Sequence, residues 1–91
     1  MSNLTTNTIP ALAAGYRFQW EEVQQCHVLL YPEGMVQLNE TAAAILSFCD
    51  GQRNVGEVVA ALESEYEAEG LYNDVAEFLL EAIEHGWVRY G

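Results

Sequence analysis

The stretch 28-VLLYPEGMVQLNETAAAILSFCDG-51 contains the signals for two strands, a tight turn and a helix. Residues 28–31 and 35–38 are short apolar runs of β-prone residues. Between them, Pro32, Glu33 and Gly34 favour a turn, because proline fixes φ and glycine accepts a positive φ. The sequence therefore predicts an antiparallel hairpin, although it leaves the pairing register of the two strands open.

The second half of the same stretch predicts a helix over residues 40–50. Asn39 is placed as its N-cap, since an asparagine side chain can accept from the free amides of a first helical turn. Gly51 suits the left-handed position that follows a last turn. The predicted inner side of this helix is apolar and consists of Ala42, Ala43, Ile45, Leu46 and Cys49.

Upstream, residues 16–21 alternate apolar and polar side chains, which is the pattern of a half-buried strand. Its aromatic residues Tyr16, Phe18 and Trp20 share one face, which we assign to the core. With residues 22–25 as a short connection, this strand completes a three-stranded antiparallel meander. Residues 1–15 are predicted to be a flexible N-terminal tail outside the domain, with residues 9–12 able to lie on the body or on a neighbouring copy.

Two more helices follow the meander. Asn54 is the predicted N-cap of the first, and Glu57 completes a capping box with it. The other is expected to open at Asn73 or Asp74 and to stop at Gly86, leaving residues 87–90 as an extended end able to pack on the sheet. The predicted fold class is therefore α+β, a winged-helix-like domain over residues 16–91 in which a three-stranded antiparallel meander precedes a three-helix bundle.

Composition limits the function. The 91 residues allow one domain, and 51% hydrophobic residues argue against disorder. The net charge is −11, without a single lysine, which disfavours nucleic acid and anionic membranes and favours a basic partner. We see neither an apolar run of about 20 residues nor a secretory signal, so a cytoplasmic location is expected. Cys26 and Cys49 are too few for a metal box or cluster, and no disulfide is expected.

No pattern indicates catalysis. Neither His27 nor His85 has a spaced ligand partner, and glycine-rich phosphate loops and nucleophile elbows are missing from the sequence. We therefore expect no enzyme activity, no catalytic residue, no metal and no cofactor. DNA binding by the last helix is excluded on charge, because its outer face carries carboxylates and no base. That face consists of Asp74, Glu77, Glu81 and Glu84.

A binding module remains. The strand at residues 35–38 is the last of the meander, so it is expected at a sheet edge, where an extended peptide can add as a further strand. Met35 and Gln37 would point to one side of this strand, and Val36 and Leu38 to the other. The last helix would supply a second wall. In the alternative, the edge is covered by the tail or by a second copy.

The segments VLLYPEG, LNETAAAIL and CDG, in this order and with two helices after them, resemble the PqqD family of pyrroloquinoline quinone biosynthesis from residue 16 onward. The resemblance implies a peptide chaperone, a peptide-recognition element that binds the precursor peptide PqqA and presents it to the radical S-adenosylmethionine enzyme PqqE. That enzyme would cross-link a Glu and a Tyr of the peptide and carry the cofactors. The resemblance also implies quinone binding.

The same resemblance implies where the peptide lies, against the third strand and the third helix. Carried over to this chain, the peptide-binding residues are Met35, Val36, Gln37, Leu38, Val75, Phe78, Leu79 and Ile83. The four helical residues have an alternative assignment to plain core, and the sequence does not separate the two uses. We expect a monomer that can form a strand-swapped homodimer through residues 16–21. The alternative function is an acidic winged-helix regulatory domain that binds a protein partner and no peptide.

Overall fold

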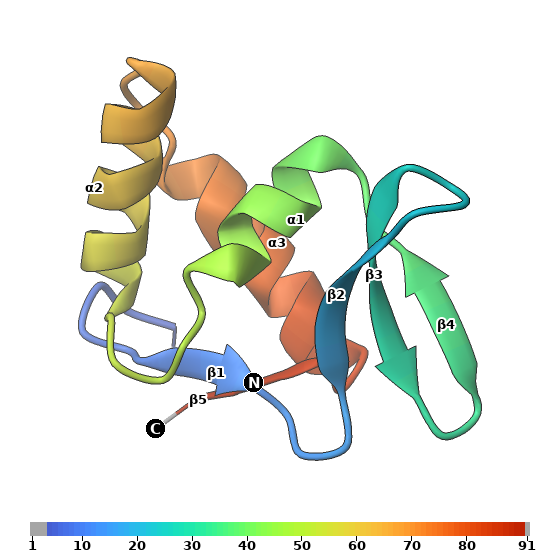
Figure 1. Cartoon of the computed structure of the whole chain (residues 1–91). Coiled ribbons are helices and arrows are strands. Elements are labelled where there is room, and N and C mark those ends of the chain that lie inside the picture. The colour runs from blue at the N-terminus through green and yellow to red at the C-terminus, as the bar shows by residue number, and fades with distance from the viewer. Residues whose placement is uncertain (1–3, 91) are drawn as a thin grey trace.

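A computed structural model describes residues 4–90 of the chain (Figure 1). Three strands form one antiparallel sheet, and three helices follow them in the chain. The elements are β1 (Pro10–Leu12), β2 (Arg17–Glu21), β3 (Cys26–Tyr31), β4 (Gly34–Gln37), α1 (Glu40–Ser47), α2 (Val55–Tyr66), α3 (Tyr72–Glu84) and β5 (Val88–Tyr90). The predicted α+β class, with a three-stranded meander before three helices, is confirmed. Within residues 4–90, no helix has both the length and the apolarity needed to cross a membrane.

The three-stranded sheet has the order β2-β3-β4, so β3 is central and β2 and β4 are its edges. Leu29 on β3 is fully buried and pairs with Phe18 on β2 and with Val36 on β4. Because residues directly opposite one another share a face, these three side chains lie on the face of the sheet that packs on the helices. The hairpin turn consists of Pro32 and Glu33, whereas Gly34, which the sequence assigned to the turn, begins β4 opposite Tyr31.

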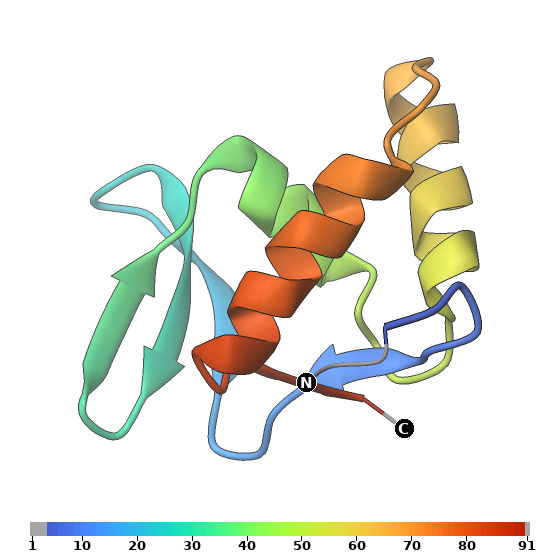
Figure 2. The same ribbon diagram turned by 180° about the vertical axis from the view of Figure 1, so that it is seen from behind.

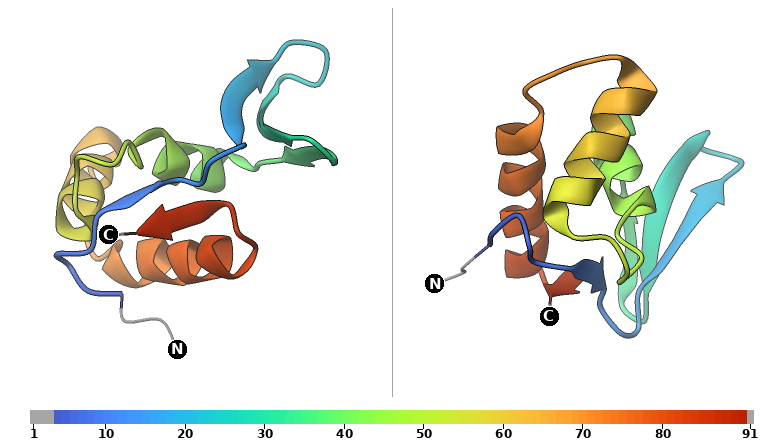
Figure 3. Two further views of the ribbon diagram at one scale, coloured as in Figure 1. Left: turned by 90° about the horizontal axis from the view of Figure 1, so that it is seen from below. Right: turned by 90° about the vertical axis from the view of Figure 1, so that its left-hand side faces the viewer.

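The prediction of a tail without a fold of its own is wrong for residues 10–12. These residues form β1, which pairs antiparallel with β5 in a second, two-stranded sheet (Figure 3). The C-terminal end therefore does not join the three-stranded sheet. Pro10 is fully buried, and its carbonyl accepts from the Gly51 amide at 3.1 Å. A three-residue strand is too short to give an alternating pattern, so the sequence carried no signal for it. Residues 1–3, part of the predicted tail, lie outside the described residues.

Two of the three helices begin as predicted. The Asn39 side chain accepts from the Ala42 amide at 2.7 Å, and Asn54 and Glu57 form a capping box at α2. At α3 the prediction of a cap at Asn73 or Asp74 is wrong. This helix begins at Tyr72, and Leu71 precedes it without a side-chain cap. Instead, the Leu71 amide donates to the Glu63 carboxylate at 3.0 Å, a contact eight residues apart that local pattern could not indicate.

The hydrophobic core lies between the inner face of the sheet and the three helices. α1 contributes Ile45 and Leu46 to it, and α3 contributes Val75 and Leu79. Cys49 is buried among them as expected, and both cysteines are free. The aromatic row of β2 departs from its prediction at one end, because Trp20 is 47% exposed. It lies near the loop between β2 and β3, where it lines a hollow together with residues of α1 and α2.

We expect Asn39→Ala to lower the free energy of unfolding by about 1 kcal/mol, because it removes the side chain that accepts from the Ala42 amide. Asn73→Ala is a matched control near the start of α3, where Asn73 is exposed and caps nothing. We expect the free energy of unfolding of this control to stay within about 0.5 kcal/mol of that of the parent. Urea unfolding followed by circular dichroism measures both changes. Equal stability of the two variants would show that Asn39 does not act as a cap.

Candidate functional site

The outer edge of β4 is the first candidate for a binding site. β4 ends the order β2-β3-β4, and no other strand among the described residues pairs with its outer side. Seen from behind, β4 is the outermost strand and α3 runs beside the sheet (Figure 2). A strand edge of this kind offers unpaired backbone groups to an extended chain.

The pairing register shows which backbone amides of this edge point outward. Leu38 lies opposite His27 and donates its amide to the His27 carbonyl at 3.0 Å. In an antiparallel pair, hydrogen-bonded and non-hydrogen-bonded positions alternate. The amides of Val36 and Gly34 therefore also point toward β3, whereas those of Met35 and Gln37 point away from it. The register that the sequence left open is thus fixed, with two free donors on the outer edge.

The side chains of this strand divide as predicted. Met35 is 40% exposed and Gln37 is exposed, while Val36 is half-buried and Leu38 is buried. The Gln37 amide nitrogen donates to the side-chain oxygen of Gln24, in the loop between β2 and β3. This long-range contact was not visible in the sequence.

The four predicted helical residues divide into two pairs. Val75 and Leu79 are 2% and 0% exposed and belong to the core of the domain. Phe78 and Ile83 are half-buried at the border of the core and keep part of their side chains accessible. Val75 and Leu79 are therefore core residues, as in the alternative assignment. Phe78 and Ile83 can both pack on the core and contact a peptide.

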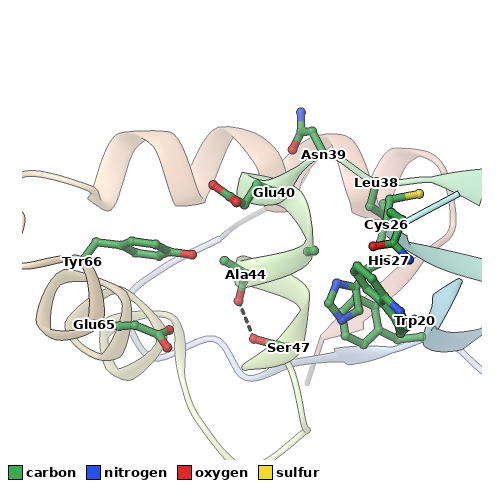
Figure 4. A pocket seen from close by; sticks show the side chains of 13 residues that line it. Trp20, Cys26, His27, Leu38, Asn39, Glu40, Ala44, Ser47, Glu65 and Tyr66 are labelled. Carbon is green, nitrogen blue, oxygen red and sulfur yellow. Dashed lines mark hydrogen bonds between the residues drawn. The ribbon is translucent and has the colours of Figure 1, made fainter. Parts of the chain in front are cut away.

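A second candidate is a hollow of about 410 Å³ lined by residues of α1, of the end of α2 and of the three-stranded sheet. Figure 4 shows Tyr66 and Glu65 of α2 on one side of α1, and Trp20, Cys26 and His27 of the sheet on the other. A neighbouring hollow of about 330 Å³ extends from α1 and Tyr66 to the beginning of α3. Of the eight predicted site residues, Leu38 lines the first hollow and Val75 the second.

Sequence reasoning did not single out the two aromatic residues of the first hollow. Trp20 was assigned to the core row of its strand. Each is the last aromatic residue of its element and precedes acidic residues, Glu21 and Glu22 in one case and Glu67 in the other. That position at the end of an element is the signal that could have predicted their exposure.

Two neighbouring groups in the turn after α1, Cys49 and Asp50, have shifted pKa values. Burial, with the Asp50 carboxylate adding to it, raises the pKa of the Cys49 thiol to about 12. This thiol donates to the Ile45 carbonyl at 3.3 Å and stays protonated at neutral pH, so it is a core residue without nucleophilic character. The Gln52 backbone amide lowers the pKa of Asp50, with smaller help from Arg53. Across residues 4–90, no three His, Cys, Asp or Glu side chains gather in a group able to hold a metal ion.

We expect no shift of duplex DNA by this chain at low salt, where electrostatic attraction is strongest. The predicted acidic face of α3 is on the surface, since Asp74, Glu77, Glu81 and Glu84 are all exposed. Phosphates are repelled from such a face. A gel-shift titration tests this, and a salt-sensitive complex in the micromolar range would contradict the charge argument.

Comparisons with known proteins agree with each other. The family model described as coenzyme PQQ synthesis protein D (PqqD) matches residues 26–88. The chain is 55% identical over 90 residues to a PqqA binding protein of Azotobacter vinelandii (strain DJ / ATCC BAA-1303), with 98% of each chain covered. It is 52% identical, over the same length and coverage, to a PqqA binding protein of Stutzerimonas stutzeri (strain A1501).

One similar solved structure is the solution NMR structure of the PqqD truncation of Methylobacterium extorquens PqqCD. It superimposes with a TM-score of 0.79 at 27% identity, and 94% of each chain is covered. That protein is described as a functional and stand-alone recognition element for a ribosomally synthesized and post-translationally modified peptide.

Proposed function

This chain belongs to the PqqD family, and from this premise we propose that it is a non-catalytic protein that binds the precursor peptide PqqA in coenzyme PQQ synthesis. The observation that carries the proposal is the free edge of β4, with the outward amides of Met35 and Gln37. The names of its relatives and the likeness to a solved recognition element support the same peptide class.

The peptide adds to β4 as a fourth strand of the sheet. Its backbone carbonyls accept from the Met35 and Gln37 amides, and its side chains lie toward α3. Among the predicted residues, Met35, Val36, Gln37, Phe78 and Ile83 contact the peptide, because each keeps part of its surface accessible. Val75, Leu79 and Leu38 instead support the strand and the helix from the core. The predicted residues thus have two roles, contact with the peptide and support of the strand and helix that hold it.

The bound peptide is then presented to PqqE, the radical S-adenosylmethionine enzyme that cross-links a Glu and a Tyr of the peptide. The cofactors of that reaction belong to the enzyme, so this chain needs none to bind and orient the peptide. An extended peptide held by its backbone keeps its reactive side chains accessible. The reaction takes place in the cytoplasm. Quinone binding stays a prediction to which we assign no residue.

An NMR titration of the labelled chain with synthetic PqqA tests peptide binding. We expect the largest shifts at the amides of Met35 and Gln37 and smaller ones at Phe78 and Ile83. The amide of Tyr90, on the separate two-stranded sheet, is the internal reference. Shifts that leave the β4 amides unchanged would contradict strand addition, and a spectrum without any shift would contradict the proposed function itself.

Strand exchange is the remaining proposal about assembly. β2 pairs with β3 along all five of its residues and connects to it through residues 22–25. We expect a monomer that exchanges β2 with a second copy at high concentration, because both copies offer the same partner strand. Sedimentation over a wide concentration range measures this. A single species throughout would count against exchange.

A further inference from the structure

The walls of the hollow across α1 are aromatic and preformed. On the sheet side, the His27 ring stacks on Phe18 with centroids 4.9 Å apart and meets Trp20 edge-on at 5.1 Å. The indole nitrogen of Trp20 donates to the Glu22 carboxylate at 3.3 Å. On the other side, Tyr66 is 51% exposed. Large aromatic residues left half in water on two sides of one hollow are typical of a protein interface.

The floor and rim of the hollow define the chemistry of its occupant. Between the aromatic walls, α1 presents the small side chains of Ala44 and Ser47, which leave room for a side chain of a partner. Glu40 and Glu65 lie at the rim, and none of the residues lining the hollow is an arginine. A hollow with aromatic walls and two glutamates at its rim, in a chain of net charge −11, fits a basic side chain next to an apolar one.

The hollow and the peptide edge do not overlap. Met35 and Gln37, which carry the outward amides of β4, do not line the hollow. Leu38 is the one residue of the proposed peptide strand that reaches it, and its side chain is buried. A peptide added to β4 therefore leaves Trp20 and Tyr66 accessible.

From this geometry we propose that the hollow is a second docking site, occupied by a basic and apolar segment of the enzyme that receives the peptide. This inference rests on the proposed function and adds to it the surface on which the enzyme binds. The chain then holds peptide and enzyme at the same time on different faces. Because the rim is acidic and exposed, docking is expected to weaken as the salt concentration rises.

The experiment measures two affinities for each variant of the full chain, one for synthetic PqqA and one for PqqE. Trp20→Ala and Tyr66→Ala remove the two aromatic walls, and Glu65→Lys reverses the charge of the rim. Tyr90→Ala is the matched control, since Tyr90 is 43% exposed on β5, away from the hollow. We expect each hollow variant to bind PqqE about tenfold more weakly and PqqA within about twofold of the parent. The control keeps both affinities, and circular dichroism verifies folding.

The two affinities separate the possible failures. A parent chain that does not bind PqqA contradicts the proposed function, whatever the hollow does. Hollow variants that bind PqqE as tightly as the parent overturn the docking site, even where PqqA binds as expected. Hollow variants that lose PqqA would place the hollow in the peptide site and overturn it as well. Loss of self-association in sedimentation, without any change in PqqE affinity, would assign the hollow to a second copy.

Discussion

Gln37→Pro is expected to lose at least about tenfold in affinity for the peptide while the domain stays folded. Proline removes the amide that points away from β3 and places its ring where a peptide strand would lie. Each lost backbone hydrogen bond costs about 1 kcal/mol, and an unsatisfied buried carbonyl on the peptide adds to that. Met35→Pro removes the other outward donor and should behave in the same way. Calorimetric titration with PqqA measures the loss.

Val36→Pro is the opposite case on the same strand. Alternation of the ladder points the Val36 amide toward Leu29, so proline at this position removes a bond inside the hairpin. We expect this variant to lose folded structure by circular dichroism, whereas Gln37→Pro keeps it. Gln37→Ala is the side-chain control, since it removes the contact with Gln24 and keeps the backbone amide. If folded Gln37→Pro binds PqqA as tightly as the parent, the peptide does not dock on this edge.

The hairpin and the beginning of the helix after it were predictable because their signals are local, whereas the prediction that this helix extends to residue 50 is wrong, since α1 ends at Ser47. Pro32 and Glu33 form the turn, and the Asn39 side chain caps the helix by accepting from the Ala42 amide, three residues along the chain. The same holds for the capping box of α2. Elements with a full period of hydrophobic pattern, such as β2 and α3, were also placed within a residue or two at their ends. Local chemistry of this kind does not depend on the rest of the fold.

Features that depend on contacts distant in the chain were not predictable. β1 exists because β5 and the loop at Gly51 offer it hydrogen-bond partners, and nothing within its three residues indicates them. The beginning of α3 depends on the carboxylate of Glu63. The strand carrying the candidate site was found from its place in the meander, but its outward amides follow only from the register of Leu38 against His27. In α3, only the burial of each side chain separates the core residues from those that a peptide can reach.

Deleting residues 1–13 is expected to unfold most of the domain at 25 °C. We call residues 5–13 the N-terminal strap. Its Thr6 and Thr8 carbonyls accept from the amides of Gly56 and Val55, at 3.0 and 2.8 Å. These are first-turn amides of α2, which have no partner within the helix. The strap therefore completes the start of a helix that lies more than 40 residues further along the chain.

The loss is large compared with the stability of a small domain. Besides its antiparallel pairing with β5, the strap makes two more long-range backbone hydrogen bonds, from Gly51 to Pro10 at 3.1 Å and from Ala13 to Trp87 at 2.8 Å. At about 1 kcal/mol each, the four bonds approach the lower end of the 5–15 kcal/mol expected for a whole domain, before the burial of Pro10 is counted.

A urea titration of the truncated chain, followed by circular dichroism, tests this expectation. Ile9→Ala in the full chain is the control, because Ile9 lies in the strap but is 38% exposed. Shortening this side chain should change the free energy of unfolding by less than about 1 kcal/mol. Adding a synthetic peptide of residues 4–13 to the truncated chain should restore helical signal, since it returns the missing carbonyls. A truncated chain that unfolds cooperatively at the same urea concentration as the parent would show that residues 14–91 form the domain by themselves, and that the strap only lies on it.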